Sequence, residues 1–248
     1  MNKKYFLTLS MLIIASVMLS ACQLPFVDVI RGSGNLTTEN REVSGFNEIR
    51  LDGAGRLVVT QGSTESLVIE AEDNIINELT SDVQGNTLVL GFQDQPWQTS
   101  LIPTRTITYT LTVSDLTDIT FNGAGDFSMD RLETSSLNLD INGAGQYNIA
   151  ELMADSLSVE ITGTGTISIA GQVTTQTVNI DGAGNYQAAD LQTVSTEITI
   201  NGLGNGTVWA SDTLDITING AGNLNFYGNP SVTQDISGAG DINNQGEK

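Results

Sequence analysis

Eight copies of a Gly-x-Gly element that follows an Asp, Asn, Ser or Thr occur in this sequence, and the last seven follow one another at intervals of 18 to 20 residues. A fixed period of this length indicates a repeat architecture, in which each unit packs on its neighbours. The fold must therefore supply one stacked unit for about every 20 residues. The first glycines of the eight copies are Gly53, Gly123, Gly143, Gly163, Gly182, Gly202, Gly220 and Gly238.

Apolar and polar residues alternate around each element. An apolar column stands two residues before the first glycine: Leu51, Phe121, Ile141, Ile161, Ile180, Ile200, Ile218 and Ile236. A second stands four residues before it, broken only by Gln234 in the last copy: Ile49, Ile119, Leu139, Val159, Val178, Ile198 and Ile216. A period of two with many β-branched residues is typical of strands.

The period and the alternation together predict an all-β fold, a parallel β-helix or β-solenoid with rungs of about 20 residues. A rung of this length traces roughly 66 Å, enough perimeter for a flattened or triangular coil with a filled interior. A leucine-rich repeat has a similar period, but no repeat here keeps its Leu-x-x-Leu-x-Leu-x-x-Asn frame. Glycines at both corner positions allow sharp turns and close packing. The structural corner glycines include Gly123, Gly125, Gly143, Gly145, Gly182, Gly184, Gly220 and Gly222.

The element is missing between Gly55 and Gly123, although the alternation continues there. This irregular N-terminal portion is expected to cap or broaden the end of the solenoid, because end rungs expose unpaired edges. Within it, residues 73–80 are predicted as one short helix with Asp73 as its N-cap. The tripeptide Gln84-Gly85-Asn86 is predicted as a hairpin turn.

Residues 1–21 have the pattern of a bacterial export signal, with two lysines before an uncharged apolar stretch that is too short to span a membrane comfortably. The stretch ends at Leu19-Ser20-Ala21-Cys22, which resembles the lipobox whose cysteine is acylated. The alternative is an ordinary buried cysteine. We predict a lipid anchor on Cys22, which makes the membrane a partner. The protein would then be exported and held on the outer side of the cytoplasmic membrane or in the outer membrane.

The segment after the anchor is polar and contains Gly and Ser, which is typical of a tether. Residues 31–34 read alternatively as a degenerate first rung. The predicted organisation is a signal peptide at 1–21, a tether at 22–45, a solenoid domain at 46–243 and a tail at 244–248. Within the domain, the irregular half covers 46–115 and the regular rungs cover 116–243.

The composition excludes several functions. The chain has 29 acidic and 9 basic residues, a net charge of −20, no histidine and one cysteine. Without histidine there is no Ser-His-Asp or Cys-His nucleophile and no His-ligated metal. One cysteine allows neither an internal disulfide nor a thiolate cluster. A nucleic acid is excluded as a partner because its binding depends on basic residues, and residues 132–247 contain none.

If the apolar columns point inward, the residue before each first glycine points outward. We interpret this column as a ladder of stacked side-chain hydrogen bonds, and the alternative is a row of contacts to a cation or a sugar. The column consists of Asp52, Asn122, Asn142, Thr162, Asp181, Asn201, Asn219 and Ser237.

Acidic residues fall on successive rungs in two places, Asp140 with Glu160 and Glu197 with Asp215. Like charges roughly 5 Å apart are unfavourable unless a cation lies between them. The pairs read either as part of a solvated acidic face or as weak Ca²⁺ sites built from carboxylate and neighbouring hydroxyl and amide oxygens. The calcium-binding Gly-Gly-x-Gly-x-Asp motif is absent. The sequence therefore predicts no firm metal site and no cofactor beyond weakly bound Ca²⁺.

Six segments of the chain resemble a known bacterial family. They are Phe46-Asn47-Glu48-Ile49, Val58-Val59-Thr60-Gln61-Gly62, Leu67-Val68-Ile69-Glu70-Ala71, Asp73-Asn74, Leu88-Val89-Leu90 and Leu116-Thr117-Asp118-Ile119. These segments and the glycine repeat are similar to the family named putative auto-transporter adhesin, head GIN domain, over residues 46–236. The resemblance implies an exported β-solenoid, usually lipid-anchored, with no established enzymatic activity and no catalytic residues to transfer.

We therefore expect a cell-surface lipoprotein that acts as an adhesin-like binding or structural module of the bacterial envelope, with an extracellular glycan or protein as partner and no catalysis. The alternative is a polysaccharide-active β-helix enzyme that uses the paired outer-face carboxylates. No cleft-forming insertion is visible in the regular rungs, which argues against the enzyme. Trp97 is predicted as a loop-borne contact or a core residue, and Trp209 as a packed strand residue.

Overall fold

The computed structural model describes residues 28–93 and 99–248, which divide into two compact units. In the smaller unit, β1 (Asp28–Arg31) pairs in parallel with β8 (Thr99–Ile102). The larger unit, residues 32–93 and 103–248, contains every other element. Within the described residues no helix is long and apolar enough to cross a membrane.

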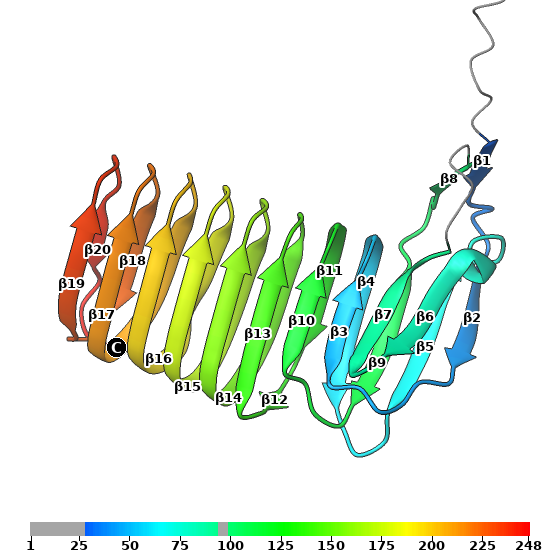
Figure 1. Cartoon of the computed structure of the whole chain (residues 1–248), viewed down its shortest axis with the longest axis horizontal. Helices are drawn as coiled ribbons and strands as arrows, with labels where there is room; N and C mark the ends of the chain where they lie inside the picture. Colours follow the sequence, from blue (N-terminus) through cyan, green and yellow to red (C-terminus); the bar gives the residue numbers. More distant parts are fainter. Residues whose placement is uncertain (1–27, 94–98) are drawn as a thin grey trace, which may run out of the picture. The chain divides into compact units, whose positions relative to one another are not determined.

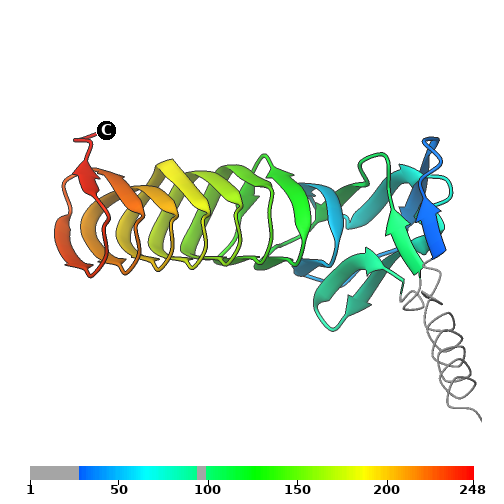
Figure 2. The ribbon, with the colours of Figure 1, turned by 90° about the horizontal axis from the view of Figure 1, so that it is seen from above.

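The larger unit contains a β-solenoid whose turns follow one another as a coil (Figures 1 and 2). Among the shorter strands, four end just before a Gly-x-Gly corner: β3 (Glu48–Leu51), β10 (Asp118–Phe121), β13 (Ser136–Ile141) and β19 (Ser231–Ile236). Four begin at or after a corner: β4 (Ala54–Gln61), β11 (Ala124–Met129), β18 (Asn223–Tyr227) and β20 (Ile242–Asn244). The others are the short β12 (Leu132–Glu133) and the long β14 (Gln146–Ile161), β15 (Thr166–Ile180), β16 (Asn185–Ile200) and β17 (Asn205–Ile218).

Neighbouring turns pair in parallel, in the register that the glycine repeat predicts. Leu139 lies opposite Val159, which in turn lies opposite Val178 and then Ile198 in the following turns. The period of about 20 residues is therefore the length of one rung, and the predicted β-solenoid is confirmed.

The two apolar columns line the interior of the coil. From Ile49 to Ile218 every member of both columns is buried. Ile236 is 39% exposed, and its strand β19 pairs with β17 on one side. Near the first regular turns the core is aromatic: the Phe121 ring centroid lies 4.7 Å from that of Tyr147, edge-on at 62°.

Each corner of the solenoid stacks on the corner before it. The backbone N–H of Thr164 donates to the carbonyl of Gly143 at 3.0 Å, and a Cβ added to Gly163 would lie 1.8 Å from that oxygen. From Gly123 to Gly240, no Gly-x-Gly glycine has a positive φ. Close approach between turns therefore requires these glycines, and a left-handed backbone does not.

The irregular N-terminal portion extends both walls of the solenoid. β7 (Thr87–Phe92) lies parallel to β3, and β9 (Thr108–Val113) lies parallel to β4. β5 (Ser66–Glu72) pairs antiparallel with β9, and β6 (Leu79–Gln84) pairs antiparallel with β7. The turn between β6 and β7 is the predicted hairpin, with Gly85 at a φ of 66°. This portion broadens the end of the solenoid, as the sequence predicts.

The Gly53 and Gly123 corners are direct neighbours in space although 70 residues separate them. Gly125 lies opposite Gly55 in the sheet, and a Cβ on Gly123 would lie 2.0 Å from the carbonyl oxygen of Gly53. The irregular portion is thus an excursion between two stacked turns.

Three local predictions are corrected: the tether at 22–45, the helix at 73–80 and the tail at 244–248. Part of the predicted 22–45 tether forms β1, paired with β8, and β2 (Leu36–Arg41), which pairs antiparallel with β5. The side chains of β2 are mostly exposed, so backbone hydrogen bonds to β5 hold the strand in place. A polar sequence can therefore form this strand. The predicted 73–80 helix is only a 3₁₀ turn at Ile76–Glu78, capped by Ile75 without a side-chain bond and not by Asp73.

The predicted 244–248 tail also follows the fold. Asn244 belongs to β20, Gln245 N–H donates to the Phe226 carbonyl at 2.8 Å, and Gly228 N–H donates to the Gly246 carbonyl at 2.9 Å. The end of the chain therefore runs along β18.

Candidate functional site

The outward column before each corner is the predicted hydrogen-bonded ladder. Asn201 Nδ2 donates to Asp181 Oδ1 at 2.6 Å, Asn219 Nδ2 to Asn201 Oδ1 at 2.8 Å, and Ser237 Oγ to Asn219 Oδ1 at 2.8 Å. A first segment joins Asn122 to Asp52 at 2.7 Å and Asn142 to Asn122 at 3.1 Å. Thr162 lies between the two segments. The amides of this column thus pair with one another along the stack.

A second ladder of amides, which the sequence reasoning missed, stands three residues after the first glycine. Asn205 Nδ2 donates to Asn185 Oδ1 at 3.1 Å, and Asn223 Nδ2 donates to Asn205 Oδ1 at 3.2 Å. The repeat shows the signal, since this column reads Arg56, Asp126, Gln146, Thr166, Asn185, Asn205, Asn223 and Asp241.

The structure brings the predicted acidic pairs together. Asp140 lies opposite Glu160, and Glu197 lies opposite Asp215, on adjacent turns. Glu160, Glu197 and Asp215 are exposed, so water solvates them. Among the described residues no group of three or more acidic or cysteine side chains is placed to hold a metal ion. Weak calcium binding by the pairs stays a prediction, and a calcium titration of the melting temperature tests it.

A groove of about 520 Å³ lies over the first three stacked corners, and we call it the corner groove. Its floor is made of small residues from successive turns, which leave the backbone open: Ala54, Gly55, Ala124, Gly125, Ala144 and Gly145. Residues 103–107, from the irregular portion, line it as well. Ile107 joins this segment to the solenoid: its side chain is buried, and its carbonyl accepts the Arg56 N–H at 2.8 Å.

The corner groove is bordered by charged side chains. Arg105 is exposed, and within the described part of the chain its guanidinium has no hydrogen bond or ion pair. Asp126 also lines the groove and is paired with Arg56: Arg56 Nη2 lies 3.7 Å from Asp126 Oδ2, and both side chains are about half exposed. An exposed guanidinium with free donors suits a carboxylate or another oxyanion, which it can bind through two parallel hydrogen bonds.

A buried carboxylate holds the segment that carries Arg105. Glu72 is 1% exposed and accepts hydrogen bonds from Thr104 N–H at 2.8 Å, Thr104 Oγ1 at 2.5 Å, Arg105 N–H at 3.3 Å and Gly34 N–H at 2.7 Å. Burial by itself raises the pKa of Glu72, but these hydrogen bonds outweigh it and lower the pKa to about 2. Glu72 is therefore a charged clamp between residues 32–34 and 103–105.

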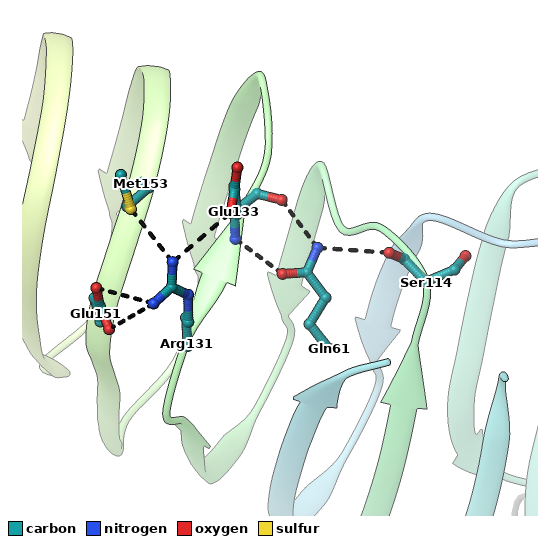
Figure 3. A network of polar contacts seen from close by, with 6 residues as sticks. All are labelled: Gln61, Ser114, Arg131, Glu133, Glu151 and Met153. Atoms are coloured by element: carbon teal, nitrogen blue, oxygen red, sulfur yellow. Dashed lines mark hydrogen bonds and ion pairs between the residues drawn. The ribbon is translucent and has the colours of Figure 1, made fainter. Parts of the chain in front are cut away.

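Unlike Arg105, Arg131 has partners for its guanidinium among the described residues, and Figure 3 shows the network of polar contacts around it. Its guanidinium lies 3.3 Å from Glu151 Oε1 and 3.7 Å from Glu133 Oε2. Gln61 connects this network to the preceding turn through two 2.9 Å hydrogen bonds with the backbone of Glu133. Arg131 is thus occupied by neighbouring carboxylates.

The corner groove was not predicted from the sequence. The regular rungs show no insertion, and the wall of the groove comes from the irregular portion instead. The available signal was the distribution of the basic residues: five arginines lie between residues 31 and 105, whereas residues 132–247 contain no basic residue. Cys22 and Trp97 lie outside the described residues. Trp209 is half-buried on β17, opposite Tyr227 on the next turn.

Comparison with solved structures shows where this fold recurs. A putative adhesin from Bacteroides fragilis NCTC 9343 is 27% identical, with a TM-score of 0.82 over 87% of this chain and 99% of that chain. A putative adhesin from Parabacteroides merdae ATCC 43184 is 23% identical, with a TM-score of 0.65 over 88% and 99%. A putative lipid binding protein from Parabacteroides distasonis ATCC 8503 is 22% identical, with a TM-score of 0.65 over 88% and 99%. At these lower identities the likeness shows the fold alone.

A comparison with curated proteins gives no match. The family model described as putative auto-transporter adhesin, head GIN domain, matches residues 45–230. This match covers the solenoid and its irregular N-terminal portion, and it agrees with the resemblance found in the sequence. The chain therefore belongs to the head GIN domain family of putative auto-transporter adhesins.

Proposed function

We propose that this protein is an adhesin-like module of the bacterial cell envelope, held by a lipid on Cys22, which binds an acidic extracellular ligand in the corner groove. The observation that carries the binding proposal is the exposed guanidinium of Arg105, which has no partner among the described residues, beside a groove of about 520 Å³. The ligand class follows from the charge: a carboxylate-bearing glycan or an acidic peptide segment complements this guanidinium.

The family, whose name describes putative adhesins, supports a role in binding without catalysis. The paired carboxylates lie on a strand face, where Asp140 and Glu160 border a hollow of about 250 Å³. A polysaccharide hydrolase would need a substrate held across two such carboxylates. Because the proposal assigns the protein to binding, it expects no release of reducing ends from neutral or acidic polysaccharides, and such release would favour the hydrolase instead.

An Arg105→Ala variant of the 28–248 fragment tests the binding proposal. We expect the wild-type fragment to be retained on acidic members of a glycan and peptide array, and the variant to lose about tenfold or more in affinity, because a charge-assisted hydrogen bond is lost. Arg131→Ala is the matched control, since it removes the same charge outside the groove. Equal retention of wild type and Arg105→Ala contradicts the site. Absence of retention on every surface supports a purely structural role instead.

A Cys22→Ala variant of the full chain tests the anchor. We expect the wild-type protein in the membrane fraction and the variant in the soluble extracytoplasmic fraction, because acyl chains contribute about 0.8 kcal/mol for each buried methylene. Metabolic labelling with a fatty acid gives a second readout. Continued membrane association of the variant would show that something other than this lipid holds the protein.

A further inference from the structure

Two aromatic side chains form a pair on the outer face of the last turns, far along the sequence from the corner groove. Trp209 on β17 lies directly opposite Tyr227 on β18. Both side chains are half-buried, so each has a ring face available to a neighbour. Aromatic faces attract cations, and tryptophan does so most strongly.

The ammonium group of Lys248 lies over both aromatic rings. Lys248 Nζ lies 5.6 Å from the Trp209 ring centroid and 5.1 Å from the Tyr227 ring centroid. The same nitrogen forms an ion pair with Asp190 and donates a hydrogen bond to the Ala189 carbonyl at 2.7 Å. Three successive turns thus surround one ammonium group with two rings, a carboxylate and a carbonyl. We call this arrangement the ammonium site.

The ammonium site continues into open space on the same face. A hollow of about 290 Å³ begins at Asp190, Ala189 and Gln187 on β16 and extends over Ser168 and Asn148 on the two preceding turns. The residues from 132 to 247 carry no positive charge, so no other side chain of the regular rungs competes for the site. The acidic surface also raises the local concentration of cations.

We infer that Trp209, Tyr227 and Asp190 form a binding site for a primary alkylammonium group, the chemistry of a lysine side chain, and that Lys248 fills this site within the chain. A primary ammonium fits better than a quaternary one, because Asp190 and the Ala189 carbonyl both accept N–H donors. This site is separate from the corner groove and opposite to it in charge, so it does not depend on the proposed function.

Lys248 is an internal competitor for any outside ligand. It lies only two residues beyond Gly246, whose carbonyl is bonded to β18, so its effective concentration at the site is high. Its side chain remains 31% exposed and Asp190 is 74% exposed, which leaves an exchange route from solvent. A ligand therefore binds the native chain weakly, and removal of the Lys248 ammonium should strengthen its binding.

The experiment uses the full chain in detergent, as wild type and as Lys248→Ala, titrated with n-butylammonium chloride and followed by tryptophan fluorescence. We expect the variant to bind at least about tenfold more tightly than the wild type, because the internal competitor is gone. n-Butanol, the neutral control of similar shape, should not bind. Lys248→Met, which keeps an unbranched side chain without the charge, should behave like Lys248→Ala.

Two further variants assign the signal. In the Lys248→Ala background, Asp190→Asn and Tyr227→Ala, which both keep the Trp209 reporter, should each abolish the saturable response, whereas Gln245→Ala, outside the ammonium site, should leave it unchanged. The inference is overturned if neither Lys248 variant shows saturable binding of n-butylammonium, or if n-butanol binds equally well. Choline binding as tight as that of n-butylammonium would overturn the assignment to a primary ammonium.

Discussion

Replacing Gly163 by alanine is expected to destabilise the solenoid by at least about 3 kcal/mol, at the upper end of the cost of overpacking. The added methyl group would lie 1.8 Å from the carbonyl oxygen of Gly143. This oxygen is backbone and accepts the Thr164 N–H, so it cannot move aside without breaking the contact between two turns. The denaturation midpoint in urea, measured on the 28–248 fragment, checks this expectation.

Thr164→Ala is the matched control for the glycine substitution. Thr164 occupies the middle position of the same corner, its side chain is exposed, and only its backbone takes part in the stacking. We expect this variant to stay within about 0.5 kcal/mol of wild type. Similar midpoints for Gly163→Ala and Thr164→Ala would contradict this expectation. They would mean that neighbouring turns can move apart at the corners without loss of stability.

Replacing Glu72 by glutamine is expected to lower the melting temperature by several degrees and to weaken binding in the corner groove. The amide can no longer present acceptor oxygens on both sides, so N–H groups of Thr104, Arg105 or Gly34 lose their partner. The segment that carries Arg105 then loses its clamp. Thermal unfolding followed by circular dichroism checks the stability, and Glu70→Gln is the control, since Glu70 is an exposed residue on the same strand.

The low pKa of Glu72 also makes the stability depend on pH in a defined direction. The pKa is lowered from 4.5 to about 2 in the folded chain, so the unfolded state binds the proton more readily. The stabilisation by Glu72 is therefore complete above pH 4.5 and is lost as the pH falls toward 2. Wild type should lose more stability over this interval than Glu72→Gln. Parallel stability curves for the two proteins would contradict the charged clamp.

The regular rungs could be predicted from the sequence because their determinants are local and repeated. The alternation around each corner fixes which side chains enter the core, and Ile141 and Ile161 are buried as expected. The corner glycines lie in close contact with the corner of the neighbouring turn, and which atoms meet there depends on the register between the stacked turns.

The corner groove could not be predicted because it depends on contacts between distant segments. The pairing of β9 with β4 brings Arg105 beside Gly55. The sequence around Arg105 contains no pattern that predicts this pairing. The clamp likewise joins Glu72 to Thr104 and Gly34, more than 30 residues away on either side. The strand β2 was missed for a related reason, since its partner β5 supplies the backbone bonds that its polar side chains do not signal.

The direct stacking of Gly53 beneath Gly123 has a consequence for how such proteins change length. Residues 62–113 leave the solenoid after the Gly53 turn, and the chain rejoins it at the Gly123 turn, which stacks directly on the Gly53 turn. The number of regular turns beyond Gly123 can therefore vary without altering the structure of residues 62–113. Each added or deleted repeat would move the ammonium site along the coil by about 4.8 Å, the spacing of neighbouring strands, relative to the corner groove. The distance between the two sites therefore changes in steps of one strand spacing. Duplication of a 20-residue unit is a simple route to a new distance between them.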